Sequence, residues 1–162
     1  MPASANTCCA PATPFTPAVS LVKALDVALE LIEEEGLDRI LARHDLLARA
    51  TRGGVRALGL DVFGDPDERS TVVTAIELPD SIDGGQVPRL LRERGIVANG
   101  GQGQLKGRIL RIPHCGYFGA FDVVVSLAGL ELALQELGAD VELGAGVAGA
   151  QQVFAEAGIP VA

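Results

Sequence analysis

The sequence predicts an α+β fold in which helices pack on one face of a small, mainly antiparallel sheet. Two segments with helical periodicity come first, short β-branched segments follow, and a long apolar helical segment comes after them. The order is helix, helix, strand, strand, helix, strand, strand, helix, which suits one helical layer on such a sheet. The 162 residues are 48% hydrophobic, so one domain with its own core is expected.

The first two helices are expected over residues 16–35 and 37–58, because apolar residues recur there at intervals of three or four. Thr16 or Ser20 is a candidate N-cap of the first helix. The Gly53–Gly54 pair is expected to be a soft spot in the second helix, since glycine lowers helix propensity.

Shorter elements follow these helices. The expected strands are residues 60–63, 71–78, 96–98 and 108–112, and the expected helices are a short one from Val87 that Gly95 closes and a long one over residues 121–137. The predicted domain therefore covers residues 16–137. Residues 1–15 have a linker-like, disordered composition, and residues 138–162 are expected to be a Gly/Ala-rich tail with weak helical character.

Composition excludes several classes of partner. The formal net charge is -8, and the 13 Lys and Arg residues are scattered, so no basic footprint for nucleic acid is present. No apolar run is long enough to span a bilayer, and the first residues lack the pattern of a secretory signal. A cytoplasmic protein without a membrane or nucleic-acid partner is expected.

The cysteines do not predict a disulfide framework. Cys8 and Cys9 are adjacent, and Cys115 stands alone beside His114. Together these four residues are a conceivable metal set, but structural zinc sites use spaced pairs such as Cys-x2-Cys. No metal site is predicted.

A glycine-rich loop at residues 99–103 has the composition of a phosphate cradle but not its sequence. A dinucleotide fingerprint needs glycine where Lys106 stands, and a P-loop needs Gly-Lys-Ser/Thr. The loop also leads into an expected strand, not a helix. Nucleotide binding is therefore not predicted, and the bland interpretation is a plain mobile loop.

Arg111 is the most informative charged residue. On a strand it shares one face with Ile109, while Leu110 points to the other face. A desolvated guanidinium needs an anion, and its fork of donors fits a carboxylate. The alternative is an internal ion pair or a snorkelling edge-strand arginine. His114 lies in the following loop, where a histidine is usually solvated, and no nucleophilic triad is spaced along the chain, so no catalytic residue is assigned.

The segment Gly100–Gly116, which reads GGQGQLKGRILRIPHCG, resembles the C-terminal signature of class V aminotransferases of the alanine–glyoxylate and serine–pyruvate type. Residues 16–21, 34–37 and 130–137 support the resemblance, which covers about residues 13–143. It implies a fold-type-I enzyme in which a large domain carries pyridoxal phosphate on a lysine. A small C-terminal domain, the part that this chain resembles, closes over the substrate.

The resemblance also implies residue roles. Arg111 would bind the α-carboxylate of a small amino acid or 2-oxo acid. Thr16 would lie near the cofactor phosphate of a neighbouring subunit, as in a homodimer. Pro113 departs from the family, which usually has glycine there, and its fixed φ could re-aim the loop that follows Arg111.

The larger departure is the cofactor lysine. Lys23 and Lys106 are the only lysines, and neither matches the Schiff-base position. The expectation is a fragment: a substrate-carboxylate-binding domain of a pyridoxal-phosphate aminotransferase, inactive without a large domain from elsewhere. The alternative is a stand-alone regulatory module that binds a small carboxylic acid.

Overall fold

The computed structural model describes residues 17–66 and 69–158. Residues up to Ile40 and residues from Leu41 onward form two compact units. The first unit contains α1 (Val19–Glu35) and the beginning of α2 (Leu37–Ala57). Gly36 separates the two helices, and its positive φ of 83° lets its N–H donate to the carbonyl of Ile32 at 2.9 Å.

The predicted boundaries of these two helices are nearly right, whereas the predicted cap is not. The N-cap of α1 is Ala18, which makes no side-chain capping bond, and Ser20 lies inside the helix. The prediction that Ser20 caps α1 is therefore wrong. Thr16, the other candidate cap and the candidate cofactor contact, lies outside the described residues, as do the residues 1–15 predicted to be a linker.

The second unit continues α2 and contains the sheet. Its further elements are β1 (Val73–Glu77), α3 (Val87–Glu93), β2 (Asn99–Gly100), a 3-10 turn (Gly103–Leu105), β3 (Ile109–Pro113), α4 (Ala120–Glu136) and α5 (Ala145–Glu156). The strands lie in the order β1-β3-β2, and both pairings are antiparallel. The α+β class with a small antiparallel sheet is confirmed.

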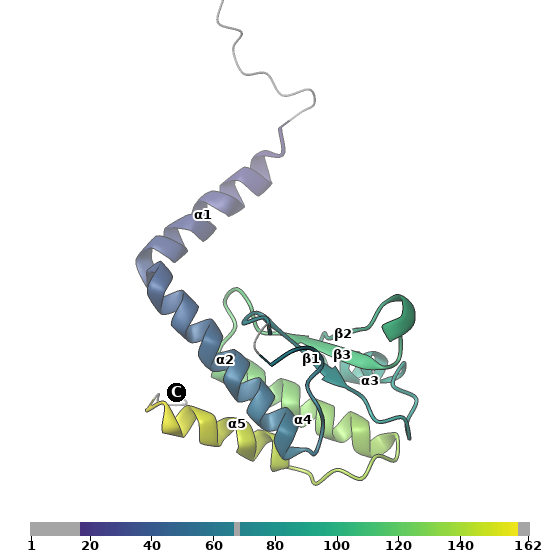
Figure 1. Cartoon of the computed structure of the whole chain (residues 1–162). Helices are drawn as coiled ribbons and strands as arrows, with labels where there is room; N and C mark the ends of the chain where they lie inside the picture. The colour runs from purple at the N-terminus through teal and green to yellow at the C-terminus, as the bar shows by residue number, and fades with distance from the viewer. Residues whose placement is uncertain (1–16, 67–68, 159–162) are drawn as a thin grey trace, which may run out of the picture. The chain divides into compact units, whose positions relative to one another are not determined.

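The two faces of the sheet differ in burial. Leu110 and Ile112 of β3 and Ile76 of β1 belong to the hydrophobic core. Figure 1 shows α4 running along this side of the sheet. Arg111 is opposite Ala75 in the register, and both side chains are half-buried. The alternation predicted for Arg111 is therefore confirmed, because its two neighbours enter the core and it does not.

Close helix packing explains the glycine pair of α2. A Cβ on Gly54 would lie 2.4 Å from Leu127 Cδ1 and 2.5 Å from the carbonyl oxygen of Gly146, so only glycine fits between α4 and α5. The helix runs through both glycines without interruption. The expected soft spot is instead a point of tight packing.

Two predicted strands differ from the structure. Residues 60–63 form a single bridge, Val62 to Ile76, beside the outer edge of β1. The strand expected at residues 96–98 is displaced to Asn99–Gly100, because the N–H of Ile96 still donates to the carbonyl of Leu91 and so completes the end of α3. Local capping of the helix end here outweighs the β propensity of the Ile-Val pair.

The segment expected to be a tail contributes to the core. Phe154 and Ala150 of α5 are fully buried and belong to the hydrophobic cluster, which therefore extends beyond residue 137. Its weak periodicity reflects a helix of small residues that packs closely on its neighbours. In the described part of the chain, no helix has both the length and the apolar character required to cross a membrane.

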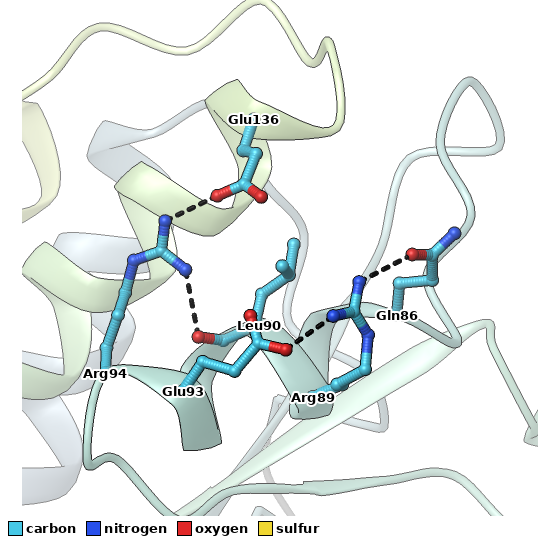
Figure 2. Close-up of polar contacts among 6 residues, drawn as sticks. All are labelled: Gln86, Arg89, Leu90, Glu93, Arg94 and Glu136. Carbon is cyan, nitrogen blue, oxygen red and sulfur yellow. Dashed lines mark hydrogen bonds and ion pairs between the residues drawn. The ribbon is translucent and has the colours of Figure 1, made fainter.

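Figure 2 shows how polar contacts tie α3 to the end of α4. Arg94, which follows α3, donates to the carbonyl of Leu90 and forms an ion pair with Glu136 of α4. Arg89 pairs with Glu93 one turn along α3. The two ion pairs are at least partly solvent-exposed, so they orient α3 more than they stabilise the fold.

Candidate functional site

Arg111 is held on the central strand by one anchoring hydrogen bond. Its Nε donates to the carbonyl oxygen of Gly100 on β2 at 3.1 Å. Arg111 makes no other hydrogen bond or ion pair to the described residues, so the two terminal nitrogens of its fork have no protein partner there. The interpretation of Arg111 as a member of an internal ion pair is thus not supported, while a fork that can accept a carboxylate fits the geometry.

A pocket of about 180 Å³ lies beside Arg111, around the beginning of β1. Its wall includes Arg52 from α2 and Arg69 from the segment before β1, as well as Asp65, Ser70 and Thr74. Among the described residues, three guanidinium groups therefore line this small pocket with one carboxylate, that of Asp65. Such a pocket has a net positive charge and is suited to an anion.

Arg52 and Arg69 are fixed mainly by backbone carbonyls. Arg69 Nη2 donates to the carbonyls of Val62 at 2.8 Å and Gly64 at 3.1 Å. Arg52 Nη1 donates to the carbonyl of Ser70 at 3.3 Å. Burial lowers the pKa of Arg52, Asp45 opposes this, and the guanidinium of Arg69 lowers it further. Within the described residues, neither arginine forms an ion pair with a carboxylate.

Sequence reasoning did not select Arg52 or Arg69. Arg52 lies among the arginines of an amphipathic helix, and Arg69 lies in a charged turn, so both have the sequence surroundings of solvated side chains. Only the pairing of β1 with β3 and the packing of α2 bring them beside Arg111.

His114 is fully buried, not solvated as a loop histidine usually is. Its Nε2 lies 2.9 Å from Thr74 Oγ1, and its Nδ1 has no hydrogen-bond partner. Burial, together with the nearby charge of Arg52, lowers the pKa of His114 to about 4. The imidazole is therefore neutral near pH 7 and serves to join the end of β3 to β1.

Pro113 leaves the course of β3 intact. It is the last residue of the strand and is opposite Val73. The next N–H, that of His114, donates to the carbonyl of Val72 at 3.0 Å. Because bonds alternate along an antiparallel pair, the nitrogen of Pro113 points away from β1, and no ladder bond to β1 is lost. Pro113 therefore does not interrupt the pairing of the strand that carries Arg111.

The glycine-rich loop is a closely packed connection between β2 and β3. A Cβ on Gly101 would lie 2.1 Å from the carbonyl oxygen of Leu105, and the N–H of Gly101 donates to the carbonyl of Ile109 at 3.0 Å. Here the glycine is needed for close approach of two backbones. This explains the motif without a bound phosphate.

The residues present do not form an attachment site for pyridoxal phosphate. Lys23 and Lys106 are exposed, and neither lines the pocket at Arg111. Nor does the described part of the chain contain a group of three or more His, Cys, Asp or Glu residues that could hold a metal ion. Cys115 is exposed, while Cys8 and Cys9 lie outside the described residues.

Comparison with known proteins finds relatives of which most are named aminotransferases. An uncharacterized aminotransferase of Methanocaldococcus jannaschii is 44% identical over 131 residues, which are 80% of this chain and 34% of the relative. Serine–glyoxylate aminotransferase of Arabidopsis thaliana is 40% identical and is matched over 85% of this chain and 35% of its own length. A Synechococcus relative with 40% identity is named the small subunit of a soluble hydrogenase, so the names of the relatives do not agree on one activity.

The fold supports the same relationship. Ureidoglycine–glyoxylate aminotransferase from Bacillus subtilis superposes with a TM-score of 0.83 and 36% identity, over 87% of this chain and 37% of the solved chain. No family model matches the sequence.

These findings define an α+β domain of the aminotransferase type. The chain corresponds to the C-terminal small domain of class V aminotransferases. It spans about a third of the length of the relatives that it matches.

Proposed function

We propose that this chain is the substrate-carboxylate-binding domain of a pyridoxal-phosphate-dependent aminotransferase. It would act on a small amino acid and a 2-oxo acid once a large domain supplies the cofactor. The observation that carries the proposal is the anchored fork of Arg111. Its Nε is bound to the carbonyl of Gly100, and Arg111 lines a pocket together with Arg52 and Arg69.

Arg111 would act by binding and orientation. A bidentate pair with the α-carboxylate is charge-assisted and fixes the plane of the carboxylate as well as its position. This holds the substrate's α-carbon in one orientation, which favours proton transfer there. Pyridoxal phosphate supplies the electron sink for that transfer in the family. In this chain the neutral, buried His114 supports the strand that carries Arg111 and does not contact substrate.

The proposal also includes a cofactor and a second subunit. Lys23 and Lys106 are exposed and are not candidates for the attachment lysine. A large domain carried by other residues would have to provide that lysine, and the family relationship suggests a homodimer, in which Thr16 would lie near the cofactor phosphate.

Complementation tests this proposal. Serine–glyoxylate aminotransferase lacking its C-terminal third would be co-expressed with this chain, and serine-to-glyoxylate transfer would be measured. We expect the wild-type chain to restore activity. Loss of a charge-assisted pair costs about 1.5–3 kcal/mol, so we expect Arg111→Gln to lower kcat/KM roughly ten- to a hundredfold. Arg108→Gln, which removes an exposed arginine from the same segment, is the matched control and should retain activity.

Three outcomes contradict or redirect the proposal. An Arg111→Gln chain as active as wild type would remove the carboxylate role. Carboxylate binding by the chain alone, with no restored transfer, would favour the stand-alone binding module. If the chain neither binds a carboxylate nor restores transfer, the proposed function has no support and has failed.

A further inference from the structure

One α-carboxylate does not account for the pocket beside Arg111. The single negative charge of a carboxylate is compensated by one guanidinium fork. Arg52 and Arg69 nevertheless line the same pocket, where Asp65 is the one acidic side chain among the residues that the structure describes. Grouping three cations around a small volume is unfavourable unless an anion compensates them.

The two additional arginines retain unused donors. Arg69 Nη2 donates to the carbonyls of Val62 and Gly64, whereas Arg69 Nε is buried and has no hydrogen-bond partner. Arg52 makes one long hydrogen bond, of 3.3 Å, to the carbonyl of Ser70. Each guanidinium carries five N–H donors, so both groups can accept an anion without breaking the contacts that position them.

The charge of the pocket contrasts with that of its neighbour. A larger hollow of about 320 Å³ near the other end of β1 is lined by Asp61, Glu77 and Asp80, with Arg108 as its basic group. That hollow repels carboxylates, whereas the pocket beside Arg111 attracts them. The basic pocket has a volume of about 180 Å³, equivalent to roughly six waters of the liquid, which is enough for a short diacid.

We propose that the preferred ligand of this pocket is a short-chain dicarboxylic amino acid or 2-oxo acid. Arg111 binds the α-carboxylate, and Arg52 together with Arg69 binds the second carboxylate. This inference rests on the proposed function for the role of Arg111 and adds the substrate class to it.

Titration of the full chain with probe acids tests the inference. Succinate and 2-oxoglutarate are the diacid probes, propionate and pyruvate are the monoacid probes, and inorganic phosphate is a further arm. The ¹⁵N-¹H signals of the arginine side chains and the backbone would be followed by NMR at pH 7.5 and constant ionic strength. We expect the diacids to bind at least tenfold more tightly than the monoacids and to shift signals of Arg52 and Arg69 as well as Arg111.

The variants separate the second subsite from the first. Arg52→Gln should lower diacid affinity at least tenfold more than monoacid affinity, so that the preference for diacids disappears. Arg56→Gln removes an exposed arginine from the same helix, one turn along, and should leave the diacid preference intact. Arg52 is chosen over Arg69 because Arg69 also holds the backbone at residues 62–64.

The results distinguish the two proposals. Equal affinity for diacids and monoacids, or a diacid preference that survives Arg52→Gln, would overturn the second subsite and leave the role of Arg111 standing. Phosphate bound as tightly as succinate would also overturn it, because the pocket would then be a general anion site. Loss of the diacid preference in Arg52→Gln, with the preference retained in Arg56→Gln, is the supporting result.

Discussion

His114 Nε2 lies 2.9 Å from Thr74 Oγ1, and both side chains are buried. Thr74 is on β1 and His114 directly follows β3, so the pair crosses the sheet beside the strand residue that carries the candidate site, Arg111. Protonation of the imidazole is unfavourable, because the ring is buried away from water and lies near the positive charge of Arg52. The structure of the site therefore depends on a histidine that stays neutral.

The first prediction concerns acid stability. The pKa of His114 is about 4 in the folded protein and near 6.5 in the unfolded chain, so the unfolded state binds more protons between these values. Stability is fully present above pH 6.5, falls as the pH is lowered toward 4, and loses roughly 3 kcal/mol from this group by that point. Urea denaturation at several pH values measures how the free energy of unfolding changes with pH.

His114→Gln provides the comparison, because glutamine can hydrogen-bond Thr74 but does not titrate. The free energy of unfolding of this variant should be lower at pH 7.5 yet fall less between pH 6.5 and 4. His44→Gln removes the other histidine, which is half-buried near Gly116, and serves as the control. Parallel slopes for wild type and His114→Gln would contradict the prediction.

The sequence predicted the layout of this fold better than its packing. Periodicity located α1, α2, α3 and α4, and alternation along residues 108–112 placed Leu110 and Arg111 on opposite faces. It did not locate β2, because a two-residue strand carries no periodic signal. It also missed the core role of α5, because Ala and Gly residues bury little area each and give a weak pattern even when they pack closely.

The second prediction concerns two helical glycines that differ in what surrounds them. A Cβ on Gly54 meets a backbone oxygen at 2.5 Å, and backbone cannot yield cheaply. Gly54→Ala should destabilise the fold by about 1–3 kcal/mol, despite the gain in helix propensity. Gly129→Ala is the matched control, because its Cβ meets the end of the half-buried Ile96 side chain, which can rotate away. Thermal denaturation of both variants checks this order, and equal losses would argue against it.

The third prediction concerns Glu131, a buried carboxylate on α4 that holds the beginning of α5. Its two oxygens accept the N–H groups of Gly144 at 2.8 Å and Val147 at 3.1 Å. Glu131→Ala removes both of these part-buried hydrogen bonds, and a hydrogen bond to a charged group contributes about 1.5–3 kcal/mol. We expect a clear loss in the free energy of unfolding and faster hydrogen exchange in α5.

Glu136→Ala is the control for Glu131, since it removes a carboxylate from the same helix. Figure 2 shows Glu136 paired with Arg94 at the surface. Exposed pairs contribute about 0–1 kcal/mol, so this variant should be nearly neutral. If both variants cost the same, the carboxylate of Glu131 does not cap α5.

The candidate site shows where sequence reasoning reaches its limit. Arg111 was identifiable because alternation along one strand and the surrounding motif both single it out. Arg52 and Arg69 were not, since they are separated by 17 positions in the sequence and meet only after α2 packs beside β1. His114 was misjudged because its loop-like surroundings, Pro113 and Cys115 to Tyr117, conceal a strand end that is covered by the core.

The last prediction concerns the cofactor. Lys23 and Lys106 are exposed, and neither lines the pocket beside Arg111 or the hollow near the other end of β1. A Schiff-base lysine is selected by the site around it and reacts far more readily than a free amine. We therefore expect equimolar pyridoxal phosphate followed by borohydride to label either lysine no more than N-acetyl-lysine under the same conditions, as read by peptide mass spectrometry. The variant with Lys23→Ala and Lys106→Ala gives the background. Stoichiometric labelling at one position would show that this chain holds the cofactor by itself. The proposal that a separate large domain supplies the cofactor lysine would then be wrong.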